Sequence, residues 1–112
     1  MAGLIKPVVI AGGGLAGLSL GIALLRRGAA VTLHEAGKYP RHRVCGEFIS
    51  GVTSETLENL GVASHFDDAM RLTSSLWFDG RGAIANLRVS GLGISRWELD
   101  DRLQKDFIKL FI

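Results

Sequence analysis

The chain has 112 residues, of which 47% are hydrophobic, so it can bury one core and suggests one small domain or part of a larger one. Its 13 basic and 11 acidic residues leave a net charge of +2 with no basic cluster, which argues against nucleic-acid binding. The single cysteine, Cys45, excludes an internal disulfide framework and a cysteine-rich zinc site, and it fits a reducing, cytoplasmic setting.

An uncharged run of 18 residues, residues 8–25, is about long enough for a transmembrane helix. However, it divides into two patterns: residues 7–11 are short and β-branched, as in a buried strand, and residues 15–27 favour a helix. Its glycines would each weaken a helix interior by about 1 kcal/mol, and Gly28 after two arginines is a helix stop. We therefore predict strand, glycine turn and helix, with neither a membrane span nor a signal peptide.

A second short strand is predicted at residues 30–33, with Glu35 just beyond its end. Two strands joined by one helix form a βαβ unit with a parallel pair. The glycines between the first strand and the helix then have the context of a dinucleotide-binding fingerprint, since an acid follows about 20 residues later.

Each part of this fingerprint has a physical reason. Gly12 allows the tight turn, Gly14 lets the backbone approach a diphosphate, and Gly17 lets the helix lie close to the sheet. The amides of Leu15 and Ala16 lie in the first helical turn, where unpaired N–H groups face the phosphates. Glu35 would accept hydrogen bonds from the ribose hydroxyls and repel a 2′-phosphate, which disfavours NADP.

The second half is predicted to hold a short helix, a β-hairpin and a longer helix. Thr53 or Ser54 caps the short helix and Gly61 ends it. The hairpin arms are residues 72–78 and 83–89, joined by a turn at 79–82, and Trp77 and Phe78 face opposite sides, so that one is exposed. The last helix has an apolar face made of Leu99, Leu103, Phe107 and Leu110.

Two segments resemble a known family. Residues 40–47, PRHRVCGE, resemble the stretch after the second strand in FAD-dependent oxidoreductases of the geranylgeranyl reductase type, whose relatives include flavin aromatic hydroxylases and halogenases. The resemblance implies that Cys45 and Gly46 contact FAD, and Arg41 and Arg43 of the same stretch are candidates to reach phosphates or an acidic substrate. Residues 94–103, ISRWELDDRL, resemble a second motif of that family, in which the arginine that starts the helix binds FAD; here it is Arg96, and Asp100 and Leu103 complete the pattern.

The expectation is thus an α/β fold, with a Rossmann-like βαβ FAD-binding unit followed by a short helix, a hairpin and a C-terminal helix. By the resemblance, residues 1–112 are the N-terminal portion of an FAD-binding domain, an incomplete domain without the substrate domain, and by themselves they would hold FAD weakly or not at all. The residues expected to contact the cofactor are Gly12, Gly14, Leu15, Ala16, Gly17, Glu35, Arg43, Cys45, Gly46 and Arg96.

The family implies a small-molecule substrate, isoprenoid or aromatic, with a membrane-peripheral location if the substrate is a lipid. Cys45-Gly46-Glu47 favours the reductase branch, and no catalytic acid or base is identifiable. A metal site is not expected, because His65 has no partners at ligand spacing. Two alternatives stay open: an inactive remnant that acts at most as a binding module, and an enzyme that binds NAD in place of FAD.

Overall fold

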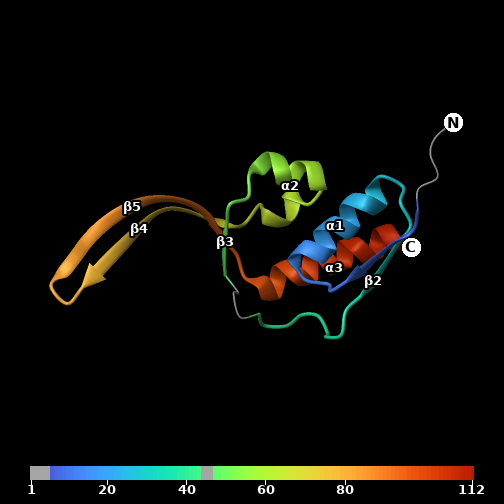
Figure 1. Ribbon diagram of the computed structural model, residues 1–112, viewed down its shortest axis with the longest axis horizontal. Coiled ribbons are helices and arrows are strands. Elements are labelled where there is room, and N and C mark those ends of the chain that lie inside the picture. The colour runs from blue at the N-terminus through green and yellow to red at the C-terminus, as the bar shows by residue number, and fades with distance from the viewer. Residues whose placement is uncertain (1–5, 44–46) are drawn as a thin grey trace.

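The computed structural model describes residues 6–43 and 47–112, and its longest dimension is 65 Å. A helical end carries the two parallel strands, and a curved hairpin projects away from it (Figure 1). The elements in chain order are β1 (Val8–Ala11), α1 (Leu15–Arg26), β2 (Val31–His34), β3 (Phe48–Ser50), α2 (Ser54–Leu60), the 3-10 helix η1 (Ala63–Phe66), β4 (Met70–Asp79), β5 (Gly82–Gly93) and α3 (Arg96–Phe111).

The N-terminal part is a βαβ unit. β1 pairs in parallel with β2, with Val8 opposite Val31, and the Gly12 N–H extends the ladder by donating to the His34 carbonyl at 2.8 Å. Gly12 has φ +107°, a conformation that glycine adopts without steric cost, and it turns the chain into α1. The predicted strand, glycine turn, helix and parallel strand are confirmed, and within the described residues no helix has the length and apolarity to cross a bilayer.

The core lies where α1 and α3 run side by side (Figure 1). Leu18 and Ile22 from α1 meet Leu99 and Leu103 from α3, and all four side chains are fully buried. Burial of each contributes about 2 kcal/mol. The predicted apolar face of the last helix is confirmed, since Phe107 is buried as well.

The short helix α2 also begins as predicted, with Thr53 as its N-cap. The Thr53 hydroxyl accepts the Thr56 N–H at 3.1 Å, and Gly61 ends the helix in the left-handed conformation. The following η1 adds one more helical turn, which packs Phe66 into the core.

The hairpin is longer than predicted, and it carries a strand that was not predicted. β4 and β5 pair from Met70 opposite Gly93 to Asp79 opposite Gly82, so only residues 80–81 form the turn. The Asp79 carboxylate accepts the Arg81 N–H at 2.7 Å, which stabilises this short turn. β3 pairs with the end of β5, with Phe48 opposite Gly93.

One expectation about the hairpin is wrong. Trp77 and Phe78 were expected to have one exposed side chain between them, yet Trp77 is 57% exposed and Phe78 is 65% exposed. The physical reason is that the outer hairpin is a two-stranded ribbon, and none of the described elements covers either of its faces (Figure 1).

Candidate functional site

The glycine loop between β1 and α1 presents bare backbone. Gly14 is the N-cap of α1, with extended backbone and no capping side chain, and the first helical bond is the Leu18 N–H to the Gly14 carbonyl at 3.0 Å. The amides of Leu15, Ala16 and Gly17 therefore lie outside the helical ladder. Together with the helix dipole, they form a site for an anion.

A cleft of about 660 Å³, the glycine-loop cleft, opens over this backbone. Six of the residues predicted to contact the cofactor line it, and the other lining residues are mainly apolar side chains from α1, α2 and β3. The six are Gly12, Gly14, Leu15, Ala16, Gly17 and Arg96. The geometry therefore joins a polar backbone end to an apolar wall, which suits a ligand with a phosphate part and an aromatic part.

Glu35 lies at the same loop, just beyond β2. Its Oε1 accepts the Gly13 N–H at 3.0 Å and an Arg41 N–H at 2.8 Å, and its Oε2 accepts the Gly37 N–H at 2.6 Å. The bond from the Gly37 amide, followed by those from Arg41 and the Gly13 amide, lowers the pKa of Glu35 to about 2. Glu35 is therefore a carboxylate at neutral pH.

The segment after β2 folds back over the loop, which the sequence reasoning missed. The Tyr39 hydroxyl donates to the Gly13 carbonyl, and burial raises the pKa of Tyr39, so the hydroxyl keeps its proton. Arg41 lies against Glu35 from the same segment. In the sequence, only the composition of this stretch, with a tyrosine and an arginine close after Glu35, could have indicated these contacts.

A second group of charged side chains lies beside the loop at Gly14. Asp100 of α3 is completely buried; its Oδ1 accepts the Arg96 Nε–H at 2.7 Å, and its Oδ2 accepts from Arg96 Nη2 at 3.0 Å and from Arg43 Nε at 3.2 Å. Both guanidinium groups face Gly14: a side chain starting there would lie 3.4 Å from Arg43 Nη2 and 3.8 Å from Arg96 Nη2. We call Arg43, Arg96 and Asp100 the arginine clamp.

The arginine clamp leaves one donor unsatisfied. Arg43 Nη2 is buried and has no hydrogen-bond partner among the described residues, since Glu35 Oε1 lies 3.8 Å away. A buried donor without an acceptor costs about 1–3 kcal/mol. An anionic oxygen beside Gly14 would supply that acceptor, so the residues present fit a phosphate group. Cys45 and Gly46 lie outside the described residues.

The described residues hold no group of three or more side chains suited to bind a metal ion. His65 instead pairs with Asp106 of α3, at 2.8 Å from Nε2 to Oδ2. This pair ties η1 to α3 and serves the packing of the core.

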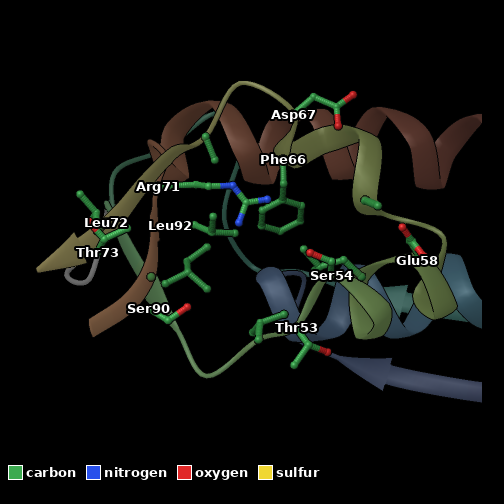
Figure 2. A pocket seen from close by; sticks show the side chains of 16 residues that line it. Thr53, Ser54, Glu58, Phe66, Asp67, Arg71, Leu72, Thr73, Ser90 and Leu92 are labelled. Atoms are coloured by element: carbon green, nitrogen blue, oxygen red, sulfur yellow. The ribbon is translucent and has the colours of Figure 1, made fainter. Parts of the chain in front are cut away.

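A second cleft, of about 420 Å³, lies between α2, η1 and the base of the hairpin. Arg71 extends into it beside the Phe66 ring (Figure 2). Neither the glycine loop nor Arg96 lines this Arg71 cleft, whereas both line the glycine-loop cleft, so the phosphate-binding chemistry belongs to the glycine-loop cleft. The two clefts share a wall of Ile49, Val52, Leu57 and Phe66.

Comparison with protein families gives a match over residues 7–71, to the model described as pyridine nucleotide-disulphide oxidoreductase. The matched residues run from β1 to the start of β4 and include the glycine loop, Glu35 and Arg43. Arg96 and Asp100 lie beyond the match.

The chain is also 31% identical over 104 residues to menaquinone reductase of Mycolicibacterium smegmatis, covering 87% of this chain and 25% of that protein. Two solved structures share its fold at 19% identity. One is p-nitrophenol 4-monooxygenase PnpA from Pseudomonas putida, with a TM-score of 0.78 over 95% of this chain and 30% of that one. The other is the flavin-dependent monooxygenase PieE in complex with FAD and substrate, with a TM-score of 0.74 over 93% of this chain and 22% of that one. The chain thus spans about a quarter of the length of its curated relative.

Proposed function

The chain belongs to the pyridine nucleotide-disulphide oxidoreductase family, and from that premise we propose that it is the FAD-binding portion of a flavin-dependent oxidoreductase. The observation that carries the proposal is the convergence of Arg43 and Arg96 on Gly14, at the N-terminus of α1. The structural neighbour in complex with FAD supports the choice of cofactor. With one cysteine, the chain has no internal cysteine pair for disulfide chemistry.

In this proposal the chain binds and orients the cofactor, and FAD supplies the two-electron chemistry. The Leu15 and Ala16 amides and the arginine clamp hold the diphosphate. Glu35 accepts a ribose hydroxyl, for which Oε2 has acceptor capacity beyond its bond from Gly37. The share of its relatives that the chain spans supports the further proposal that residues 1–112 are the N-terminal portion of an FAD-binding domain.

Titration with FAD and with NAD tests the cofactor. Both contain ADP, so both would use the glycine loop, but a flavin covers more of the apolar cleft wall than a nicotinamide does. We expect FAD to bind at least about tenfold more tightly than NAD, a difference of about 1.4 kcal/mol. Flavin fluorescence reports FAD binding, and displacement of FAD reports NAD binding.

The same titration decides between the alternatives. Saturation at concentrations well above those of the protein agrees with an incomplete site, whereas tight stoichiometric binding would show that this chain needs no further segment. Equal or tighter binding of NAD would favour a nicotinamide enzyme. Binding of neither cofactor by the longer protein that carries this chain would favour an inactive remnant.

For the reaction, we propose reduction of an isoprenoid or quinone substrate rather than hydroxylation of an aromatic ring. The relative with 31% identity is a menaquinone reductase, whereas the two monooxygenases described above share 19%. With the protein that carries this chain, its flavin reduced under anaerobic conditions, we expect a polyprenyl quinone to gain two hydrogens, as mass spectrometry of the product would show. A phenol that gains an oxygen atom in air, with no reduction of the quinone, would instead assign the hydroxylase reaction.

A further inference from the structure

We propose that Asp100 is a positioning residue, which holds the guanidinium groups of Arg43 and Arg96 together against the glycine loop so that they receive a diphosphate. This inference rests on the proposed function, because it concerns how the same site recognises its ligand. Asp100 itself does not touch the ligand in this proposal; it acts through the two arginines.

The first support is the position of Asp100 between two distant segments. Arg96 begins α3 and Asp100 follows one helical turn later, whereas Arg43 comes from the segment after β2, 57 residues before Asp100. A single carboxylate thus accepts three hydrogen bonds from two cations that the chain brings together only in the folded state. Charge-assisted hydrogen bonds of this kind stabilise the side chains that they join and also fix the orientation of those side chains.

The second support is the charge balance of the arginine clamp. Two guanidinium groups side by side repel one another, and a fully buried carboxylate is costly unless it is paired. Asp100 reduces the repulsion between the two guanidinium groups and is itself paired by them. The three side chains of the arginine clamp keep one net positive charge beside Gly14. A net positive charge at a helix N-terminus complements a diphosphate.

The third support is the direction of the donors that remain. Arg43 gives its Nε–H to Asp100, which turns Nη2 toward Gly14, where it is buried without an acceptor among the described residues. If Asp100 served only to neutralise the arginines, Arg43 Nη2 would not need to lie beside the glycine loop, where it has no acceptor among the described residues. The unsatisfied donor therefore points to a ligand oxygen.

The neighbouring residue Asp101 provides a matched control. Asp101 lies on the same helix and forms an ion pair with Lys105 at 2.8 Å, but in the described part of the chain it forms no ion pair with either arginine. Asp100→Asn and Asp101→Asn make the same chemical change, one inside the arginine clamp and one outside it.

The experiment measures affinity for ADP and for adenosine by calorimetry, because only ADP has the diphosphate. Removing partners that orient a ligand-binding side chain typically costs about 10- to 100-fold in metal affinity. By the same reasoning we expect Asp100→Asn to lower the ratio of ADP affinity to adenosine affinity by about tenfold, and Asp101→Asn to leave it unchanged. A merely structural role would lower the melting temperature, or both affinities together, without moving the ratio, and that result would overturn the proposal.

A second route keeps the test valid if Asp100→Asn does not fold. Arg43→Gln, Arg96→Gln and the double variant form a cycle, and residues held as one unit give non-additive effects on the ADP-to-adenosine ratio. Additive effects would contradict a shared clamp. A wild-type ratio near one would overturn the proposed function itself, whereas a large wild-type ratio that survives the variants would overturn only the role of Asp100.

Discussion

Replacing Gly17 with alanine is expected to lower FAD affinity by at least about 100-fold, or about 2.8 kcal/mol, and to destabilise the fold by about 3 kcal/mol. A Cβ at this position would overlap the Gly12 carbonyl oxygen and lie 3.3 Å from Ile10 Cγ2. The obstacle is backbone, so no change of rotamer relieves it, and α1 must move away from the loop that it completes. Urea unfolding measures the stability, and flavin fluorescence measures the affinity in conditions where the variant is folded.

Two other glycines provide controls of graded severity. Gly80 lies in the hairpin turn, and an added Cβ there meets nothing within 4 Å, so Gly80→Ala should change stability by less than about 0.5 kcal/mol. A Cβ added at Gly21 would lie 2.7 Å from Cε2 of the Phe107 ring, a side chain that can shift, so Gly21→Ala should destabilise the helix pair and spare the loop. If the Gly17→Ala protein folds and keeps full FAD affinity, the glycine loop is not part of the FAD-binding site.

The elements that could be predicted from the sequence depend on local properties. The glycines between a β-branched run and a helix-forming run specify a turn and a helix N-terminus, and the apolar spacing of residues 99–110 specifies the buried face of α3. β3 could not be predicted in this way. Its three residues form a strand only because β5, some 40 residues later, offers Gly91 and Gly93 as partners.

The same division applies to the candidate site. The positions of Gly14 and Glu35 follow from the βαβ order, which a single segment of sequence carries. The family motif included Asp100 but assigned it no contact, and nothing local indicates that it meets Arg43. The contact of Tyr39 with Gly13 was missed for the same reason. The two residues are 26 positions apart in the sequence, and they meet only because the segment after β2 folds back onto the glycine loop.

Glu35→Gln is expected to make the protein less stable at pH 7 by about 1–2 kcal/mol, because a charged acceptor of backbone and arginine hydrogen bonds is lost near the surface, where solvent weakens each bond. The pKa of Glu35 falls from 4.5 to about 2 on folding, so the unfolded chain takes up its proton first as the pH drops. The stabilisation is therefore fully present above about pH 5 and is lost as the pH falls toward 2. The difference in unfolding free energy between wild type and Glu35→Gln should shrink over that window, as urea titrations at successive pH values would show.

The same variant separates the stabilising role of Glu35 from its role toward the ribose. Glutamine keeps one acceptor oxygen but turns an NH2 group toward the Gly37 N–H or the Arg41 guanidinium, both of which are donors. Affinity for FAD should fall about tenfold, as expected when one charge-assisted hydrogen bond is lost, whereas affinity for flavin mononucleotide, which lacks the adenosine ribose, should stay the same. Glu58→Gln, an exposed change on α2, is the control for both measurements. If the two flavins lose affinity equally, Glu35 acts on the loop and not on the ribose, and the bonds to Gly13 and Gly37 would account for its whole effect.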